Sequence, residues 1–269
     1  MRKWPDDFIG KIIEGDCLDV MREMPDKCVD LVLTSPPYDG LRKYDGYSFP
    51  FPDIARQICR VLADGGVCVW VVGDSVVKGS ETGTSFRQAL AFMDMGLSLH
   101  DTMIYKKDSS PFPESNRYNQ TFEYMFILSK GKPKTFNPIL DPCAFVGVTS
   151  PTKTFRNADG STSAAKYEQG NATKIRENVW KYSAGYMKSS PDKATFEHPA
   201  TFPEKLAGDH VNSWTNAGDI VLDPFSGSGT SSLLAERLGR KWCGIDVSPK
   251  YCTIARKRIA AEQSQGKLF

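Results

Sequence analysis

A short segment near residue 35 combines rigidity with hydrogen-bond acceptors and an aromatic ring. It reads Thr-Ser-Pro-Pro-Tyr over residues 34–38 and follows an apolar, strand-like run. Two consecutive prolines, Pro36 and Pro37, fix φ twice and remove two backbone donors. The groups that remain are acceptors, namely the Ser35 hydroxyl and the carbonyls of Ser35 and Pro36. Such a turn can hold an amino group while Tyr38 stacks on a planar base. A proline turn that only caps a strand would look the same, so a second signal is needed.

A glycine turn near the end of the chain supplies that second signal. Residues 221–230 read Val-Leu-Asp-Pro-Phe-Ser-Gly-Ser-Gly-Thr, which predicts a strand, a turn with two glycines and the start of a helix. Glycines let the backbone approach a ligand closely, and a helix N-terminus presents free N–H groups. Asp246 follows about 20 residues after the turn, a spacing at which an acid can bind both ribose hydroxyls of a nucleoside.

The other residues of this turn narrow the choice of nucleoside. The turn contains no Gly-Lys-Ser or Gly-Lys-Thr, so it is not a P-loop, and Ser232 stands where a dinucleotide site would have its third glycine. Asp223, at the strand end, suits a ligand with a cationic part. S-adenosylmethionine carries an ammonium group, a sulfonium and a ribose but no phosphate, so the pattern favours this nucleoside. An ordinary strand-to-helix turn is the alternative that the segment alone leaves open.

Both motifs must be positioned by regular elements, and strands alternate with helices along most of the chain. Apolar runs predict strands at residues 11–13, 29–34, 66–72, 99–105, 122–128, 219–222 and 241–245. Helical spacing predicts helices around 54–62, 86–93, 230–238 and 248–263. The alternation indicates an open, mostly parallel α/β sheet. Ligands bind at the carboxyl ends of such strands, and each motif begins at one.

The pattern dissolves between residues 131 and 196, where Gly, Pro, Asn and Ser interrupt every apolar run. This segment contains ten Lys or Arg and five Asp or Glu, a net charge of +5, whereas the whole chain carries +2. A basic middle on an acidic body suggests that the middle meets a polyanion. A loop-rich, solvated surface is the alternative. Because a structureless loop of this length is unusual, we expect a small inserted module or a loop that orders on a partner.

Composition excludes several other classes of protein. No stretch of the 269 residues approaches the ~20 apolar residues of a membrane helix. No apolar run follows the basic residues at the N-terminus, as a secretory signal would require, so we expect a cytoplasmic protein. Seven scattered cysteines without a C-x-x-C pair, together with three histidines, argue against a disulfide framework and against a metal site.

Considered jointly, the motifs resemble those of the amino-group DNA methyltransferases, which methylate N4 of cytosine or N6 of adenine. Ser-Pro-Pro-Tyr at 35–38 and Asp-Pro-Phe-Ser-Gly-Ser-Gly-Thr at 223–230 carry most of the resemblance. Residues 14–18 resemble the family's segment that contacts the adenine of the cofactor, 244–251 its ribose-binding segment, and 198–203 the segment beside the methionine end. The tetrapeptide precedes the cofactor loop, and this permuted order resembles the family's β group, whose target-recognition region lies between the two.

The resemblance implies the fold, the domains and the partners. The expected fold is α/β, a Rossmann-like S-adenosylmethionine-dependent methyltransferase fold with a mostly parallel central sheet, helices on both faces and a small inserted recognition region. Residues 1–130 would form the catalytic half, 131–196 the target-recognition insertion and 197–269 the cofactor-binding half of the same domain. S-adenosyl-L-methionine is the expected cofactor and double-stranded DNA the expected partner, with no metal and no membrane. A cognate restriction endonuclease is compatible with this role, and the oligomeric state is left open.

The resemblance, with the charge pattern, also assigns site residues. The catalytic residues would be Ser35, Pro36, Pro37 and Tyr38. The cofactor would be bound by Asp16, Cys17, Phe202, Pro203, Asp223, Phe225, Ser226, Gly227, Gly229, Thr230, Asp246 and Val247. The candidates for DNA contacts are Arg42, Lys106, Lys107, Arg117, Lys153, Arg156, Lys174 and Arg176.

The implied mechanism begins with a nucleotide that is flipped out of the duplex, at a cost of a few kcal/mol. Stacking of the base on Tyr38 would recover about 1–3 kcal/mol. The Ser35 hydroxyl and the Pro36 carbonyl would accept the amino protons and aim the nitrogen lone pair at the methyl group. No covalent intermediate is needed. Family members with Ser at the first position mostly resemble cytosine enzymes, so we expect methylation of cytosine N4, with adenine N6 as the alternative.

Three rival functions leave weaker marks in the sequence. Methylation of cytosine C5 needs a nucleophilic cysteine, and Pro142-Cys143 with Glu177-Asn178-Val179 resembles parts of that family. These residues fall in the irregular region, and the glutamine usual after the cysteine is absent. Methyltransferases that act on RNA or protein usually have Asn first in the tetrapeptide. A catalytically inactive DNA-binding protein on the same scaffold would be expected to have an altered tetrapeptide or to lack a cofactor acid.

Overall fold

The chain folds into two compact units. The computed structural model describes residues 2–37, 49–108, 116–143, 149–168, 172–183 and 203–265. Unit 1 comprises residues 1–137 together with 178–269, and unit 2 comprises Pro138–Glu177. Across the described part of the chain, no helix is long and apolar enough to cross a membrane.

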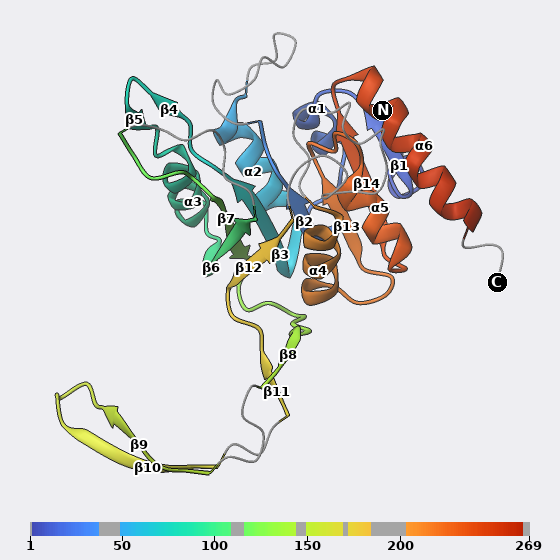
Figure 1. Cartoon of the computed structure of the whole chain (residues 1–269). Helices are drawn as coiled ribbons and strands as arrows, with labels where there is room; N and C mark the ends of the chain where they lie inside the picture. The colour runs from blue at the N-terminus through green and yellow to red at the C-terminus, as the bar shows by residue number, and fades with distance from the viewer. Residues whose placement is uncertain are drawn as a thin grey trace. The chain divides into compact units, whose positions relative to one another are not determined.

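Unit 1 is built on one eight-stranded sheet with the strand order β1-β14-β13-β2-β3-β7-β6-β12 (Figure 1). Its strands are β1 (Lys11–Glu14), β2 (Val29–Thr34), β3 (Leu62–Val72), β6 (Ser98–Lys107), β7 (Phe122–Ser129), β12 (Val179–Tyr182), β13 (Ile220–Asp223) and β14 (Lys241–Asp246). All neighbouring pairs are parallel except those of β7, which is antiparallel to both β3 and β6. A small hairpin, β4 (Val76–Val77) with β5 (Ser80–Glu81), lies outside this sheet.

Helices cover both faces of the sheet, which is why its central strands are apolar on both sides. The helices are α1 (Cys17–Arg22), α2 (Phe51–Val61), α3 (Thr84–Asp94), α4 (Glu204–Trp214), α5 (Thr230–Arg237) and α6 (Pro249–Gln265). The first three pack together on one face, over a core that includes Val32 and Trp70, and the last three pack together on the other (Figure 1). Leu31 and Leu33 alternate with Val32 along β2, and all three are fully buried. The expected α/β architecture, a mostly parallel sheet with helices on both faces, is therefore confirmed.

The helix predicted around residues 86–93 forms as α3, but its apolar stripe faces outward. Phe86, Leu90 and Met93 are 48%, 58% and 42% exposed. The buried face instead contains Gln88 and Phe92. Gln88 is buried because its side-chain oxygen accepts a hydrogen bond of 2.9 Å from the indole nitrogen of the fully buried Trp70 in β3. A polar residue thus takes the core position, which apolar spacing alone does not predict.

The order of the strands reverses between β2 and β13. The chain passes from β2 through α2 to β3 on one side, and from β13 through α5 to β14 on the other side. β2 and β13 are direct neighbours, with Val221 opposite Leu31 and Leu222 opposite Val32. In open α/β sheets, ligands bind outside the carboxyl ends of the strands at such a reversal. Both sequence motifs follow these two strands.

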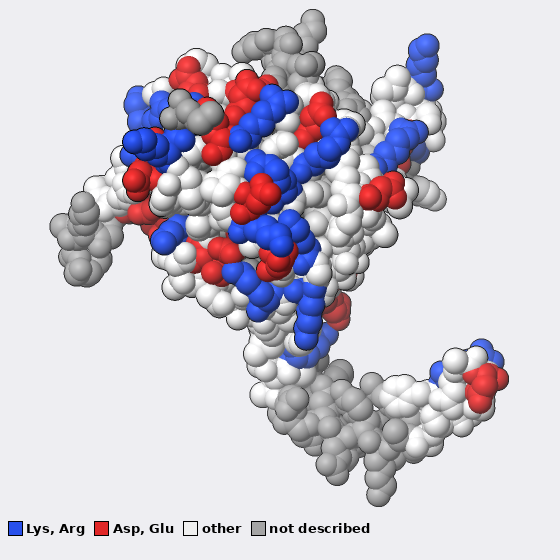
Figure 2. Space-filling view, turned by 180° about the vertical axis from the view of Figure 1, so that it is seen from behind, with Lys and Arg blue, Asp and Glu red and all other residues white. Residues whose placement is uncertain are grey.

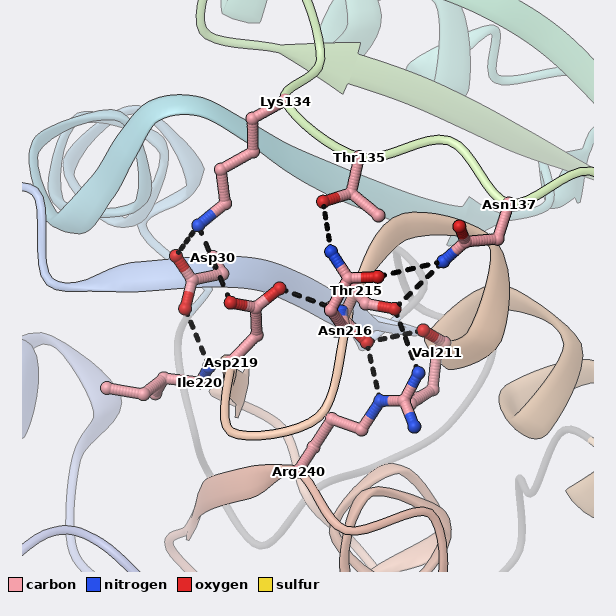
Figure 3. A network of polar contacts seen from close by, with 10 residues as sticks. All are labelled: Asp30, Lys134, Thr135, Asn137, Val211, Thr215, Asn216, Asp219, Ile220 and Arg240. Carbon is pink, nitrogen blue, oxygen red and sulfur yellow. Dashed lines mark hydrogen bonds and ion pairs between the residues drawn. The ribbon is translucent and has the colours of Figure 1, made fainter.

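The amino-terminal edge of the sheet is held by a polar network (Figure 3). Lys134 lies in the segment after β7, and its ammonium group contacts Asp30 at 2.5 Å and Asp219 at 3.6 Å. The other oxygen of Asp30 accepts a hydrogen bond of 2.7 Å from the backbone nitrogen of Ile220. In the same network the Asn137 amide nitrogen donates to the backbone oxygens of Asn212 in α4 and of Thr215 directly after it, and Arg240 donates to Thr215. The network fixes residues 134–137 of unit 1 in place.

Replacing Asp30 by alanine is expected to lower the free energy of unfolding by about 1–3 kcal/mol, because a partly buried backbone N–H of β13 loses its acceptor. The matched control is Asp64→Ala, which removes an exposed ion pair with Lys27 and should leave stability close to that of the wild type. Urea unfolding of both variants makes the comparison. Equal stability of the two variants would contradict the structural importance of the network.

Unit 2 consists of two antiparallel strand pairs. β8 (Leu140–Pro142) pairs with β11 (Thr173–Ile175), and β9 (Thr149–Arg156) pairs with β10 (Thr162–Glu168). The first pair is joined by the Arg176 guanidinium, which contacts the Asp141 carboxylate through both Nε and Nη2. Unit 2 contains five Lys or Arg and four Asp or Glu, a net charge of +1. Most of the positive charge expected between residues 131 and 196 therefore lies in the flanking segments.

The end of the predicted insertion departs most clearly from the expected boundary. Residues 179–182 form β12, a strand of the central sheet that pairs with β6, and the compact unit ends at Glu177. Trp180 and Tyr182 are buried whereas Val179 and Lys181 are exposed. This alternation is typical of a strand with one buried face. It extends over only four residues among many breakers, which is too short to predict a strand from sequence.

Candidate active site

One buried carboxyl group joins the two motifs at the strand reversal. The Thr34 hydroxyl at the end of β2 donates to Asp223 Oδ1 at 2.7 Å, and the backbone nitrogen of Phe225 donates to the same oxygen at 3.1 Å. Ser231 Oγ in α5 lies 2.7 Å from Asp223 Oδ2. Asp223 is only 3% exposed, and burial raises the pKa of its carboxyl group to about 6. The tetrapeptide and the glycine turn, 188 positions apart in the sequence, are therefore physically connected.

The tetrapeptide leaves β2 at this connection. Ser35 is half-buried, Pro36 is buried and Pro37 is half-buried. Tyr38, the predicted stacking residue, lies outside the described residues, as does Arg42. The structure thus brings the first three predicted catalytic residues to the edge of the sheet where the glycine turn begins.

The glycine turn lies tightly against β14. Gly227 and Gly229 have φ of 51° and 80°, in the left-handed region that favours glycine. A Cβ atom on Gly229 would lie 2.7 Å from Ala255 Cβ of α6, and one on Gly244 of β14 would lie 2.5 Å from Ser226 Oγ. The backbone nitrogen of Ser226 donates to the Ile245 carbonyl at 2.8 Å. Only glycine at 229 and 244 allows this close approach.

Asp246, at the end of β14, is held in place beside the turn. Its carboxylate accepts hydrogen bonds from the backbone nitrogens of Gly227 at 2.7 Å and Ser248 at 2.8 Å. Burial raises its pKa. A carboxylate has about four acceptor positions, so two remain for the two hydroxyls of a ribose. Ser226 Oγ is also buried and, among the described residues, has no hydrogen-bond partner. These features fit a nucleoside cofactor.

A buried arginine supports the turn from α6. The Arg258 guanidinium donates to the Ser228 carbonyl at 2.6 Å and to Glu204 Oε1 at 2.8 Å, and only 3% of the Arg258 side chain is exposed. Glu204 begins α4, directly after Pro203, which is buried at the N-cap position. Arg258 therefore joins the glycine turn to the segment predicted to lie beside the methionine end of the cofactor. Phe202 of that segment lies outside the described residues.

The remaining predicted cofactor residues surround the same edge. Asp16 follows β1 and caps α1, with its Oδ1 accepting from the Leu18 nitrogen at 2.7 Å, and Cys17 is buried. Val247, next to Asp246, is 51% exposed. Phe225 is half-buried against Phe49, with 5.6 Å between the ring centroids. Thr230 is buried at the start of α5.

The predicted DNA-contacting residues fall into two groups. In the first group each side chain has a partner within the protein. The Lys107 ammonium contacts Glu123 at 2.6 Å, and that of Lys174 contacts Glu177 at 2.8 Å. Arg117 donates to the Gly79 carbonyl, and Arg176 contacts Asp141. The second group is exposed and includes Lys106 on β6 and Arg156 at the end of β9. The side chain of Lys153 lies outside the described residues.

Sequence reasoning missed one basic residue beside Lys106. Lys181 on β12 is directly opposite Lys106 on β6, and both side chains are exposed. Within the described part of the chain neither ammonium group has an ion-pair partner. Like charges on opposed positions of neighbouring strands repel each other, so the pair favours a polyanion in contact with it. Figure 2 views the molecule from behind, and on the face it shows basic and acidic side chains are interspersed.

Ser231, Glu204 and Arg258 were also missed. Ser231 directly follows the glycine motif in α5, whereas Glu204 and Arg258 support the motif from α4 and α6. Only the acidic or basic character of Glu204 and Arg258 inside helices with buried faces could have drawn attention to them. Among the described residues, no group of three or more His, Cys, Asp or Glu side chains could hold a metal ion.

The mostly parallel sheet, its reversal between β2 and β13 and the glycine turn beside Asp246 define a Rossmann-like protein with a site for a nucleoside cofactor. A family model described as DNA methylase, of the N6/N4 type, matches residues 29–257. The chain belongs to this family of amino-group DNA methyltransferases, and S-adenosyl-L-methionine is its cofactor.

Individual proteins that are similar to this chain are named as methyltransferases. The chain is 51% identical over 245 residues to the orphan methyltransferase M.BamHII of Bacillus amyloliquefaciens, with 89% of this chain and 92% of that protein covered. Its fold is similar to that of the PvuII DNA methyltransferase (cytosine-N4-specific), with a TM-score of 0.66, 22% identity and coverage of 93% of this chain and 89% of the other. The M1.HpyAVI–SAM complex gives a TM-score of 0.61 at 22% identity, covering 93% and 98%.

Proposed function

We propose that this chain is a site-specific methyltransferase that methylates N4 of a flipped cytosine in double-stranded DNA. The observation that carries the proposal is Ser35 at the head of the tetrapeptide, at the strand reversal and joined through Thr34 to the cofactor turn. A serine hydroxyl can accept a proton from the N4 amino group or donate toward N3 of cytosine. The similarity of the fold to that of the cytosine-N4-specific PvuII DNA methyltransferase supports the same choice. A DNA substrate also favours a cytoplasmic location.

The cofactor would lie across the carboxyl ends of β13, β14 and β1. Asp246 would accept both ribose hydroxyls with its remaining acceptor positions, and Val247 would pack on the adenine near Asp16 and Cys17. The turn from Ser226 to Thr230 and the segment at Pro203 would enclose the methionine end. When bound, S-adenosylmethionine supplies an electrophilic methyl group.

The chain itself contributes acceptors and rigid positioning. An exocyclic amine is a poor nucleophile because its lone pair is conjugated with the ring. The Ser35 hydroxyl and the Pro36 carbonyl accept hydrogen bonds from its two N–H groups, which favours a tetrahedral nitrogen with its lone pair directed at the methyl group. Because the two prolines fix φ, the acceptors keep their positions without the target base, and most of the rate enhancement is positioning.

The methylated nucleoside distinguishes cytosine from adenine. Purified protein, cofactor labelled in the methyl group and a plasmid are incubated, and the DNA is digested to nucleosides. We expect the label in N4-methylcytosine. Label in N6-methyladenine, with none in N4-methylcytosine, would replace cytosine by adenine and leave the role of Ser35 as an acceptor in place.

DNA would be contacted by unit 2 and by the edge of the central sheet. In unit 2, Lys153 and Arg156 of β9 would contact phosphates. Lys174 and Arg176 would instead stabilise the unit through their ion pairs. Lys106 and Lys181 would bind phosphates near the carboxyl edge of the sheet. A two-stranded hairpin such as β9–β10 is at best marginally stable alone in water, so DNA binding would order it further.

Replacing Lys106 and Lys181 by alanine is expected to weaken DNA binding and to reduce the slope of log K against log salt by about two, because about one counterion is released for each phosphate contact. The double variant Lys153→Ala with Arg156→Ala should act in the same direction. The matched control, Lys27→Ala with Lys241→Ala, removes two exposed lysines at the amino-terminal edge of the sheet. Fluorescence anisotropy at several salt concentrations measures the slopes. Identical slopes for all three double variants and the wild type would place the DNA surface elsewhere.

A further inference from the structure

We propose that Asp223 is a positioning residue, whose carboxyl group holds the end of β2 against the cofactor turn and does not contact the ammonium group of the cofactor. This inference rests on the proposed function, because it concerns how the same site is held together. It replaces the role expected from sequence, in which the Asp223 carboxylate binds the cationic part of the cofactor directly.

Hydrogen bonds within the protein use three of the roughly four acceptor positions of the Asp223 carboxyl group. Oδ1 accepts from the Thr34 hydroxyl at 2.7 Å and from the Phe225 nitrogen at 3.1 Å, and Oδ2 lies 2.7 Å from Ser231 Oγ. With 3% of the residue exposed, the carboxyl group is surrounded by protein. Thr34 immediately precedes Ser35, so Asp223 fixes the residue next to the catalytic serine.

The hydrogen bonds around the Ser231 hydroxyl are compatible with an uncharged side chain at position 223. Ser231 Oγ has a single proton but lies within hydrogen-bond distance of two oxygens, Asp223 Oδ2 at 2.7 Å and the Leu33 carbonyl at 3.0 Å. A protonated Asp223 donates to Ser231, which then donates to Leu33, and every group is satisfied. An asparagine does the same, because its Nδ2 donates to Ser231 while its Oδ1 accepts from Thr34 and Phe225. A ligand for the ammonium group would instead need the negative charge.

Three substitutions separate these roles. Asp223→Asn keeps the shape and the hydrogen bonds but removes the charge, Asp223→Ala removes both, and Thr34→Val removes one donor. The matched control is Ser232→Ala, because Ser232 Oγ is buried in the same helix as Ser231 and has no hydrogen-bond partner among the described residues. Two ligands are compared by calorimetry: S-adenosylmethionine, and 5′-methylthioadenosine, which keeps the nucleoside but lacks the ammonium group.

Misplacement of the tetrapeptide should appear in kcat. We expect Asp223→Ala and Thr34→Val to lower kcat by about tenfold to a hundredfold with little change in KM for the cofactor. Asp223→Asn should restore most of kcat, and Ser232→Ala should match the wild type. The ratio of affinities for the two ligands should be the same in Asp223→Asn as in the wild type.

A selective loss of S-adenosylmethionine affinity in Asp223→Asn, with the affinity for 5′-methylthioadenosine retained, would overturn the inference and return Asp223 to the ammonium group. If Asp223→Ala does not fold, Asp223→Asn and Thr34→Val still decide. If the wild type itself transfers no methyl group to DNA, the proposed function fails, and the ratio of affinities still tests the role of Asp223.

Discussion

Replacing Ser35 by alanine is expected to slow methyl transfer about a hundredfold, the effect of removing one preorganised hydrogen-bonding group from the position where charge develops. As the amino nitrogen attacks the methyl group it becomes positively charged, and the Ser35 hydroxyl is the side-chain acceptor nearest to it in the proposed arrangement. The neighbouring Pro36 carbonyl remains, so a residual rate is expected. Single-turnover kinetics with labelled cofactor measures the step without product release.

The control for this variant is Ser98→Ala, which removes an exposed hydroxyl at the start of β6. Cofactor affinity should be the same in Ser35→Ala, Ser98→Ala and the wild type, because Ser35 lies on the acceptor side of the reaction. A wild-type rate in Ser35→Ala would remove the hydroxyl from the mechanism. A parallel loss of cofactor affinity would assign it to binding.

The second large effect is expected from Asp246→Ala, which should weaken cofactor binding by about 1.5–3 kcal/mol, the range for hydrogen bonds to charged groups. Two contributions act together: the ribose loses its acceptor, and the backbone nitrogens of Gly227 and Ser248 lose theirs. Calorimetric titration of the folded variant gives the affinity. The matched control is Asp19→Ala, an exposed acid on α1.

The choice of ligand sharpens the test of Asp246. A ribose contact predicts that Asp246→Ala loses the same factor in affinity for S-adenosylmethionine and for 5′-methylthioadenosine, because both contain the ribose. Unchanged affinity for both ligands in a folded variant would refute the ribose assignment. Loss for S-adenosylmethionine alone would refute it as well and move the contact to the methionine end.

The strands at the centre of the sheet could be predicted because they are buried on both faces. β2 and β3 are long apolar runs with no competing pattern, and the two motifs directly follow predicted strands. The neighbourhood of β2 and β13 is different in kind. It depends on strand pairing between residues about 190 positions apart, which no local pattern contains. The sequence predicted only that both motifs follow strands of one mostly parallel sheet.

Helix α4 escaped prediction because polar residues and a glycine interrupt its buried face, which also contains Leu206, Val211 and Trp214. His210 and Ser213 are buried on it, together with Gly208. Burial lowers the pKa of His210 to about 3, so the ring is neutral near pH 7 and packs 4.8 Å from the Trp180 ring. Periodicity of apolar residues cannot reveal such a face. For the same reason the apolar spacing in α3 predicted the wrong buried face, because Gln88 occupies a buried position there.

The role of Asp223 could not be read from its position in the motif. An acid at a strand end beside a glycine turn is compatible with a ligand contact and with an internal one. Its hydrogen-bond partners Thr34 and Ser231, from which the internal role is inferred, lie on two other elements. The positive φ of Gly227 and Gly229 agrees with the expected glycine turn, because this requirement is local. The close approach that the structure shows at Gly229 is to Ala255 of α6.

The central claim is that the chain methylates an exocyclic amino group of a base in DNA, with the acceptors of residues 35–36. The most direct measurement is mass spectrometry of nucleosides from the DNA of cells that express either the wild type or Ser35→Ala. The account predicts N4-methylcytosine in DNA from cells with the wild type and a strong reduction of it with Ser35→Ala at equal protein level. Appearance of 5-methylcytosine, or DNA without any added methyl group from cells with folded wild-type protein, would contradict it.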